Sequence, residues 1–402
     1  MRIGIIKEGK IPADERVPFS PEQTRLISAR YPQIDLVVQK SNVRAFKDEE
    51  YAAEGVDLVD DLKDADVIFG VKEVQIDDLL SHKTYFFFSH TIKKQSYNRK
   101  LLQTVLERSI KLVDYECLTN SSGGRLVGFG RYAGIVGAYN AFLTYGKRSG
   151  IYDLKPASKC KNRVEMEGCL SRVKLPKNFK IVMTGNGRVA GGVLEIIEQL
   201  PIKKVSPQDF LSKDFDEAVY TQLTVEDYFR KPDGSNFKSE EAFEYPELFE
   251  SDFVKYTKVA DMYITAHFWD ARGPRIFTEE DLAADDFKIR TIADISCDIA
   301  GPIPSTIRPS TIEDPIYFIN RKTLKEEDEF NEDFVSVMAV DNLPCELPKD
   351  ASEDFGEELI QKVLPNLIGR DDDTVIERAT IAQNGKLMPA FEYLQDYVEG
   401  KE

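Results

Sequence analysis

One short segment in the middle of the chain constrains the fold more than any other. Residues 179–184 (Phe-Lys-Ile-Val-Met-Thr) form an apolar run typical of a β-strand, a glycine turn begins at Gly185, and residues 193–199 continue as a helical pattern. A strand, a glycine turn and a helix in this order are typical of a dinucleotide-binding unit, although an ordinary strand-to-helix turn has the same outline. Glycines let a pyrophosphate reach the backbone amides at the helix N-terminus, where the helix dipole favours negative charge. The segment therefore predicts cofactor contacts from Gly185, Gly187 and Gly191.

The sequence leaves the choice between NAD and NADP open, with NAD preferred. In dinucleotide-binding units a carboxylate after the second strand binds the ribose hydroxyls. Here the second strand is predicted at 202–205, and Ser206 and Pro207 follow it, with Asp209 a little farther on. The usual carboxylate is missing from its expected place, so the preference for NAD is a hypothesis.

The length and the order of the patterns predict two domains. A chain of 402 residues exceeds the size at which one hydrophobic core keeps growing. In the first third, short apolar runs alternate with helical patterns, and a last long pattern, at 354–364 and 374–397, is predicted to be helical and to pack on the first domain. We predict an α/β protein with two Rossmann-like domains, parallel sheets flanked by helices, and an interdomain cleft. The substrate-binding and catalytic domain is expected at 1–137 and 330–402, and the dinucleotide-binding domain at 138–329.

Composition excludes several classes of protein. The formal net charge of -17 disfavours nucleic acid as a partner. Five cysteines without a CxxC pair and three histidines without ligand spacing predict neither a disulfide framework nor a metal site. The apolar run at the N-terminus is too short for a signal peptide, and no other run approaches the length of a membrane span. We therefore expect a cytoplasmic monomer or homodimer that binds a small molecule and no metal, nucleic acid or membrane.

Four cations lie at or just beyond predicted strand ends in the first domain, namely Lys7, Lys10, Arg16 and Lys72. Open α/β sheets bind ligands at the carboxyl ends of their strands, so these residues are expected to bind a substrate carboxylate despite the acidic chain. Lys72 follows the apolar strand at 66–71, and an amine that is partly buried and crowded by other cations has a lowered pKa, as a general base needs. Each cation taken singly is also consistent with a solvated surface charge.

Two further polar positions follow apolar runs in the same domain. His90 ends the strand predicted at 85–90, where a histidine is either structural or catalytic. Glu116 and Arg125 flank a turn, which is consistent with an ion pair that anchors a loop. A helix is also predicted at 97–108, with Ser96 as its N-cap.

Several motifs resemble a known superfamily over nearly the whole chain. Lys7-Glu8, Glu15-Arg16-Val17, Val71-Lys72-Glu73, the strand end at His90 and the glycine turn together resemble the alanine dehydrogenase and transhydrogenase superfamily. Within it, the segments at 89–95, 114–116, 124–134 and 340–348 resemble the lysine-forming saccharopine dehydrogenases. The missing ribose carboxylate and the insertions at 150–177 and 225–250 depart from the pattern of a plain family member.

The resemblance implies roles for individual residues. Lys72 is expected to take the proton from the secondary amine of the substrate, and His90 to act as acid and base in imine hydrolysis. Three residues are expected to line the substrate site, Arg16, Arg125 and Phe129, and four polar residues to support it, Lys10, Glu73, Gln95 and Glu116. Further cofactor contacts are expected from Lys93, Arg188, Val189, Phe268, Asp298, Asp341, Asn342, Leu343 and Pro344, with Asp298 near the nicotinamide.

The expected function is the NAD(P)-dependent oxidative deamination of saccharopine to lysine and 2-oxoglutarate, or the reverse condensation. A nearby alternative is an amino-acid dehydrogenase similar to alanine dehydrogenase, because it shares the lysine, arginine and histidine. A second alternative is a regulatory protein that binds a dinucleotide without turnover, since a fold does not determine a function.

Overall fold

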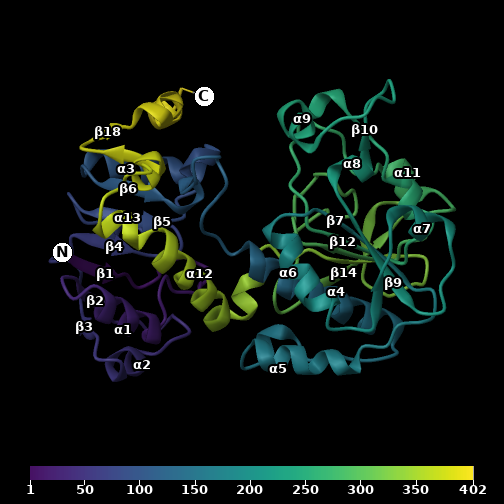
Figure 1. Ribbon diagram of the computed structural model, residues 1–402, viewed down its shortest axis with the longest axis horizontal. Coiled ribbons are helices and arrows are strands. Elements are labelled where there is room, and N and C mark those ends of the chain that lie inside the picture. Colours follow the sequence, from purple (N-terminus) through teal and green to yellow (C-terminus); the bar gives the residue numbers. More distant parts are fainter. Residues whose placement is uncertain (402) are drawn as a thin grey trace. The chain divides into compact units, whose positions relative to one another are not determined.

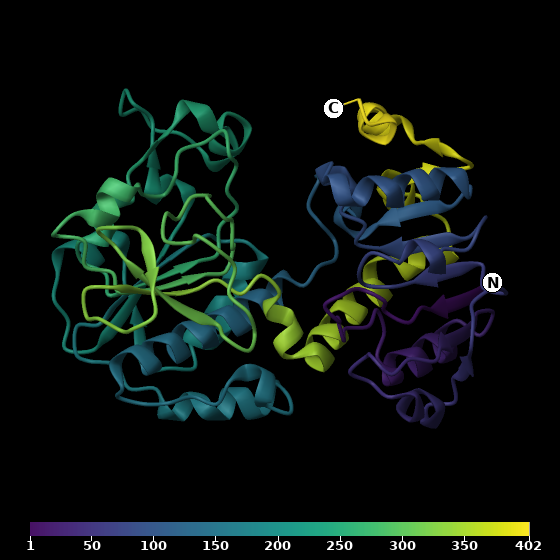
Figure 2. The ribbon, with the colours of Figure 1, turned by 180° about the vertical axis from the view of Figure 1, so that it is seen from behind.

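The computed structural model describes residues 1–401, which form two compact units (Figure 1). The first unit combines Met1–Phe129 with the chain from Pro348 onward, and the second contains Gly130–Leu347. The first unit therefore joins the two ends of the sequence, which Figure 2 shows as purple, blue and yellow segments within one body. The units divide at 129/130 and 347/348; the predicted boundaries at 137/138 and 329/330 and the predicted cleft stay a prediction.

The first unit is built on an eight-stranded sheet with the order β18-β17-β6-β5-β4-β1-β2-β3. Its strands are β1 (Arg2–Ile5), β2 (Asp35–Gln39), β3 (Asp57–Val59), β4 (Val67–Phe69), β5 (Thr84–Phe87), β6 (Lys111–Asp114), β17 (Thr380–Gln383) and β18 (Lys386–Leu387). The six strands from the N-terminal part pair in parallel, and β17 pairs antiparallel with β6.

Helices cover both faces of this sheet, so its central strands are apolar on both sides. The helices are α1 (Pro21–Arg30), α2 (Asp48–Ala53), α3 (Arg99–Glu107), α12 (Pro348–Lys362), α13 (Leu364–Ile368), α14 (Val375–Ala379) and α15 (Gln395–Glu399). Phe86 packs in a core with residues of α1 and α12, whereas its neighbours Tyr85 and Phe87 pack in a second core with residues of α3 and α15. Because side chains alternate along a strand, the two faces of this sheet contribute to two separate cores.

Two local predictions for this unit are wrong. The segment 374–397 is not one helix: it forms α14, the strands β17 and β18, a 3₁₀ turn and α15. Its apolar residues are buried by pairing with β6, a long-range contact that overrides the local pattern. Ser96 does not cap a helix either, because Ser96–Asn98 forms a 3₁₀ turn and α3 begins at Arg99.

The second unit contains an eight-stranded sheet with the order β15-β14-β16-β13-β12-β7-β9-β8. Its strands are β7 (Lys180–Thr184), β8 (Ile202–Lys204), β9 (Ala218–Leu223), β12 (Met262–Thr265), β13 (Thr291–Asp294), β14 (Ile316–Asn320), β15 (Lys325–Glu327) and β16 (Val335–Met338). Strands β14 and β15 are antiparallel to their neighbours, and the others are parallel. A separate small ribbon pairs β10 (Phe229–Arg230) with β11 (Glu250–Ser251). The two mostly parallel sheets confirm the predicted fold class.

Close packing of two helices positions the glycine turn in this unit. The helices are α4 (Gly130–Ser149), α5 (Arg163–Gly168), α6 (Arg188–Ile197), α7 (Pro207–Ser212), α8 (Val225–Tyr228), α9 (Ser239–Glu244), α10 (Val254–Thr257) and α11 (Glu279–Ala283). A Cβ added to Gly134 in α4 would overlap the carbonyl oxygen of Val189, and one added to Gly192 in α6 would overlap that of Arg131. Glycine at both positions lets the two backbones touch, so α6 is held directly behind the turn.

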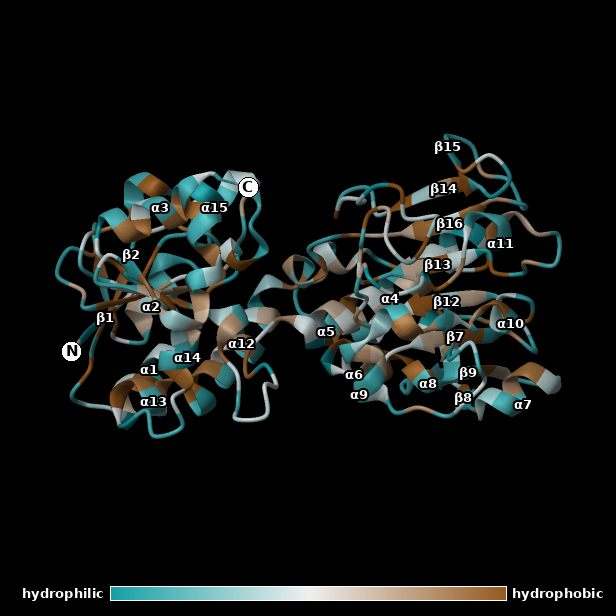
Figure 3. Ribbon diagram, turned by 90° about the horizontal axis from the view of Figure 1, so that it is seen from above, coloured by the Kyte–Doolittle hydropathy of each residue, from teal (hydrophilic) through white to brown (hydrophobic). Residues whose placement is uncertain are grey.

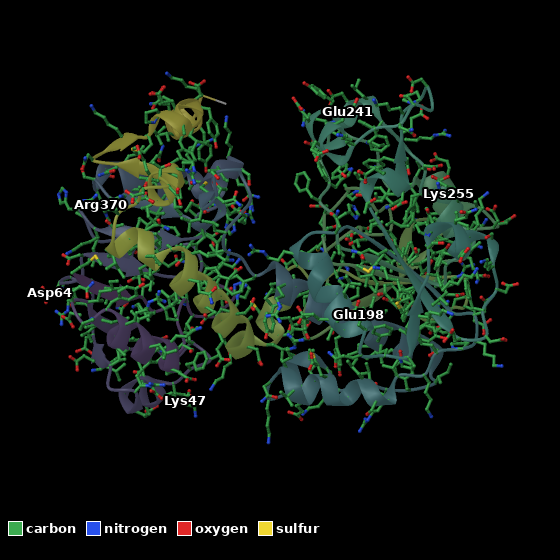
Figure 4. All side chains as sticks on the ribbon, in the orientation of Figure 1. Lys47, Asp64, Glu198, Glu241, Lys255 and Arg370 are labelled. Carbon is green, nitrogen blue, oxygen red and sulfur yellow. The ribbon has the colours of Figure 1, made fainter. Side chains whose placement is uncertain are left out.

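Hydropathy and charge are arranged as in a folded α/β protein. Helix α3 alternates between brown and teal in Figure 3. Its apolar residues Leu101, Leu102 and Val105 are buried. The labelled charged residues Lys47 and Asp64 lie at the edge of the first unit in Figure 4. Among residues 1–401 no helix is both long and apolar enough to span a bilayer.

Candidate active site

The carboxyl edge of the first sheet holds Lys72, which follows β4. Its backbone is fixed by Glu8, which follows β1: the two carboxylate oxygens of Glu8 accept the N–H groups of Val71 (2.7 Å) and Lys72 (3.1 Å). Burial outweighs these hydrogen bonds and raises the pKa of Glu8 to about 8. No role was predicted for Glu8, although its position shortly after the buried strand β1 was the available signal.

The side chain of Lys72 has the environment predicted for a base. Its pKa is lowered by burial and then by the positive charges of Arg16 and Lys10, while Asp14 and Glu73 oppose the shift. A lowered pKa increases the fraction of neutral amine near neutral pH. The structure therefore brings Lys10, Arg16 and Lys72 close enough to influence one another.

Arg16 is held between an acid and an aromatic ring. It forms a buried ion pair with Asp14 (2.6 Å), and its guanidinium lies 4.1 Å from the centroid of the Phe129 ring. Phe129 in turn stacks on Phe355 of α12, with ring centroids 4.4 Å apart. Burial opposes ionisation of Asp14, but the hydrogen bonds from Arg16 prevail and lower the pKa of Asp14. Asp14 and Phe355 were not among the predicted site residues.

Glu73 joins two predicted residues through its carboxylate. It accepts from the ammonium of Lys10 (2.8 Å) and contacts Nδ1 of His90 (2.5 Å). Burial disfavours the charge, yet the hydrogen bonds from His90 and Lys10 hold the pKa of Glu73 at about 2. Nδ1–H then donates to the carboxylate, and Nε2 of a neutral His90 carries the lone pair. His90 adopts a left-handed backbone conformation (φ 53°), and its ring stacks with Phe88.

The remaining predicted residues of the first unit form separate contacts. Glu116 lies 3.3 Å from the Lys93 ammonium and 3.5 Å from the Arg125 guanidinium, so the predicted anchoring pair is present and includes a third partner. Gln95, in contrast, accepts a hydrogen bond from the exposed Tyr97 hydroxyl (2.5 Å). Lys7 forms an ion pair with Asp78 (3.7 Å).

In the second unit the glycine turn leaves space for a ligand at the start of α6. Gly185 has a φ of 106°, and an added Cβ would overlap the carbonyl of Ala266, so no other residue fits. An added Cβ at Gly187 would meet no atom within 4 Å. Arg188 and Val189 lie in the first turn of α6. A Cβ added to Gly191 would also meet no atom within 4 Å. Open space beside backbone N–H groups at a helix N-terminus fits a dinucleotide pyrophosphate.

The strand next to the glycine turn is β9, and not β8 as the sequence suggests. The N–H of Gly185 donates to the carbonyl of Leu223 (2.9 Å), and the amide of Gln222 donates to the carbonyl of Gly185 (3.0 Å). The position that usually holds a ribose-binding carboxylate is therefore near Thr224, the residue after β9. Thr224 is the N-cap of α8, and its hydroxyl and N–H both contact the Asp227 carboxylate.

The carboxyl ends of β12 and β13 contain a buried polar group that sequence reasoning missed. Asp294 is fully buried and accepts from the hydroxyls of Thr265 (2.7 Å) and Thr306 (2.6 Å). Burial, followed by the charge of Asp294, raises the pKa of Asp298, the residue expected near the nicotinamide. Phe268 lies beyond β12 and is 74% exposed.

The four residues of the predicted turn at 341–344 differ in burial. Leu343 and Pro344 are buried and start a 3₁₀ turn, whereas Asp341 is exposed and Asn342 is partly buried. Only the two polar residues of this turn are therefore accessible to a ligand through their side chains. The structure does not test any of these cofactor contacts, which stay predictions.

Comparison with known families places the first part of the chain. Residues 4–136 match the family described as alanine dehydrogenase/PNT, N-terminal domain. The first part of the chain is thus similar to this N-terminal domain. Two solved structures share the fold at 16% identity: an L-alanine dehydrogenase (TM-score 0.65, covering 99% of this chain and 100% of that chain) and a transhydrogenase from Sinorhizobium meliloti (TM-score 0.61, covering 97% and 100%). At this identity the likeness shows the fold alone.

Curated relatives extend the similarity over most of the chain. Alpha-aminoadipic semialdehyde synthase of Mus musculus is 30% identical, over 97% of this chain and 47% of that protein. The enzyme of the same name from Arabidopsis thaliana is 28% identical, over 98% and 41%. Saccharopine dehydrogenase (NAD(+), L-lysine-forming) of Emericella nidulans is 26% identical, over 94% and 95%. The chain is a homologue of these enzymes, and it spans about half the length of the first two.

Proposed function

We propose that this chain is an NAD-dependent oxidoreductase that converts saccharopine, NAD and water to lysine, 2-oxoglutarate and NADH, or catalyses the reverse condensation. The homology to lysine-forming saccharopine dehydrogenases over nearly their whole length supports the substrate. The observation that carries the proposal is the partly buried Lys72 among cations, next to a carboxylate that orients His90. Together these groups supply a base, an orientable imidazole and positive charge for carboxylates.

In the proposed mechanism Lys72 removes the proton from the secondary amine of saccharopine. Glu8 fixes the backbone of Lys72, so the Lys72 amine extends from a rigid strand end. The cations around Lys72, among them Arg16 and Lys10, attract the substrate carboxylates in a chain whose net charge is -17. Bound NAD supplies the hydride acceptor for the carbon beside the nitrogen, which leaves an imine on the substrate.

His90 serves the hydrolytic half of the reaction. With Nδ1–H bound to Glu73, Nε2 accepts a proton from the water that attacks the imine carbon. The resulting carbinolamine loses lysine as the amine and leaves 2-oxoglutarate as the ketone. Because Glu73 also binds Lys10, the same carboxylate orients the imidazole and positions one of the cations.

The proposal keeps the predicted cofactor contacts at Gly185, Gly187 and the first turn of α6, and takes the protein as a cytoplasmic monomer or homodimer. NADH oxidation with lysine and 2-oxoglutarate tests the reaction directly, and NADPH in a parallel series tests the cofactor. Turnover with pyruvate and ammonia alone would favour the alanine dehydrogenase alternative. NADH binding without turnover of any pair would favour the regulatory alternative.

A further inference from the structure

The second unit contains a cavity at the amino edge of its sheet. It has a volume of about 330 Å³ and lies at the starts of β7, β12 and β13 beside the last turn of α4. Ten residues line it, namely Tyr145, Arg148, Pro176, Lys177, Asn178, Phe179, Asp261, Lys288, Arg290 and Thr291. Strand β7 runs from this edge to the glycine turn, so the cavity lies at the opposite end of the sheet from the proposed cofactor contacts. It is independent of the proposed function.

Cations dominate the lining of this cavity. Four cations line it, Arg148, Lys177, Lys288 and Arg290, against one carboxylate, that of Asp261. This carboxylate is already engaged, because one oxygen lies 3.1 Å from the Lys288 ammonium and the other accepts a backbone N–H (2.8 Å). In a chain with a formal net charge of -17, a cavity with a local excess of positive charge is an exception that attracts small anions.

The two arginines of the cavity lie near other positive charges, and a bound anion would reduce the electrostatic repulsion on them. Burial and then the neighbouring charge of Arg290 lower the pKa of Arg148 to about 10, and burial and then Arg321 lower the pKa of Arg290. Both guanidiniums donate to backbone carbonyls, Arg148 to that of Phe334 (2.8 Å) and Arg290 to that of Phe287 (2.6 Å). Carbonyls satisfy the donors without cancelling the charge. Acidic residues at 332–333 offset part of the repulsion on Arg148.

A buried hydroxyl gives a second, independent indication. Thr291 is 1% exposed, and its Oγ1 has no hydrogen-bond partner among residues 1–401. Most buried polar groups in folded proteins are hydrogen-bonded, so a lone hydroxyl in the wall of a cationic cavity suggests a ligand acceptor. Lys177 at the rim is exposed and available to the same ligand.

We propose that this cavity is a binding site for a small oxyanion of the size of phosphate or a short dicarboxylate. Ligand pockets typically have volumes of roughly 300–1,000 Å³, so a cavity at the lower end of this range suits a small anion and excludes a dinucleotide. Oxygen atoms of either ligand accept from Arg290, from Lys177 and from the Thr291 hydroxyl. Phosphate and carboxylate share this chemistry, and the experiment separates them.

The test is calorimetric titration of the full chain saturated with NADH, so that the dinucleotide contacts are occupied. Inorganic phosphate and succinate are titrated separately at constant ionic strength, and the tighter one identifies the source. We expect one site, whose Kd rises about tenfold in Arg290→Gln, because one charge-assisted contact is lost. Lys177→Gln should raise the Kd about threefold to tenfold. Thr291→Val should raise it about threefold without lowering the melting temperature, because valine suits a strand and removes an unpartnered hydroxyl.

Lys258→Gln is the matched control, because this exposed lysine of the same unit pairs with Asp286 and does not line the cavity. It should leave the Kd unchanged. If neither anion binds at concentrations up to about 10 mM, the proposal is overturned. It is also overturned if binding is equal in the wild type and in Lys177→Gln and Thr291→Val. These two variants keep the test valid should Arg290→Gln fail to fold, and the melting temperature reports on folding in each case.

Discussion

The carboxyl edges of the two sheets use side chains in opposite ways. In the first unit, Glu73, Lys10 and His90 form a chain of charged contacts, and Arg16 is clamped by Asp14. In the second unit, the turn at Gly185 works because side chains are absent. Removing a charge should therefore break the first edge, and adding atoms should break the second. This contrast indicates which kind of variant separates chemistry from cofactor binding.

The largest effect is expected for Lys72→Met. Positioned general bases typically contribute about 10²–10⁴-fold to rate, so turnover should fall by this factor while NADH binding is retained. Lys83→Met is the control, because Lys83 precedes β5 at the amino edge and donates to the Lys63 carbonyl (2.6 Å). Steady-state rates and NADH fluorescence titration measure both quantities. Full turnover in Lys72→Met would remove this residue from the mechanism.

Gly185→Ala and Gly187→Ala should separate fold from cofactor in the second unit. At Gly185 the left-handed φ and the overlap with the Ala266 carbonyl should reduce the free energy of unfolding by at least about 2 kcal/mol and abolish NADH binding. At Gly187 the added methyl meets no protein atom, so stability should be unchanged while NADH affinity falls about tenfold or more. Urea unfolding and NADH titration check these values. Unchanged NADH affinity in Gly187→Ala would place the pyrophosphate elsewhere.

Glu73 and Glu8 should give the first edge opposite dependences on pH. The pKa of Glu73 is lowered from 4.5 to about 2, so its stabilisation is complete above pH 4.5 and is lost as the pH falls toward 2. Glu73→Gln should remove on the order of 1–3 kcal/mol from the free energy of unfolding at neutral pH and weaken its acid dependence. Unfolding measured at acidic and neutral pH tests this, and an unchanged acid limb would contradict it.

The pKa of Glu8 is raised from 4.5 to about 8, so the sign is reversed. Its contribution to stability is present below pH 4.5 and is lost as the pH rises through 8. Glu8→Gln should therefore flatten the alkaline side of the stability curve in the same unfolding experiment. An unchanged alkaline side in this variant would contradict the raised pKa of Glu8.

The smallest expected effect tests which strand is followed by the residue that contacts the ribose. Thr224→Asp places a carboxylate after β9 but loses the hydrogen bond from the Thr224 hydroxyl to Asp227, so the uncharged Thr224→Asn is measured beside it. A carboxylate there should weaken NADPH binding about tenfold by repelling the 2′-phosphate, with NADH binding retained. Ser206→Asp is the matched control, since Ser206 is also an N-cap but follows β8. An effect in Ser206→Asp alone would show that the sequence order of the strands, and not the pairing order, is relevant.

Much of the first edge was predictable because its residues follow strands directly. Lys72, His90 and Glu116 come after apolar runs, and parallel strands bring such positions to one edge. Asp14, Phe355 and Asp294 were not predicted. Asp14 lies in a loop with no periodic pattern, and Phe355 reaches Phe129 from the far end of the chain. Asp294 ends an apolar strand and could have been found by the same rule as Lys72 and His90.

The sequence by itself determined the local elements: the strand and glycine turn at Gly185, the cations at strand ends and the α/β class. Tertiary structure alone decided that β9 lies beside β7 and that residues 380–383 join the first sheet as β17. The physical reason is the distance along the sequence over which each interaction acts. Periodicity and turn chemistry act between residues a few positions apart, whereas strand order depends on hydrogen bonds and burial between segments that are distant in the sequence.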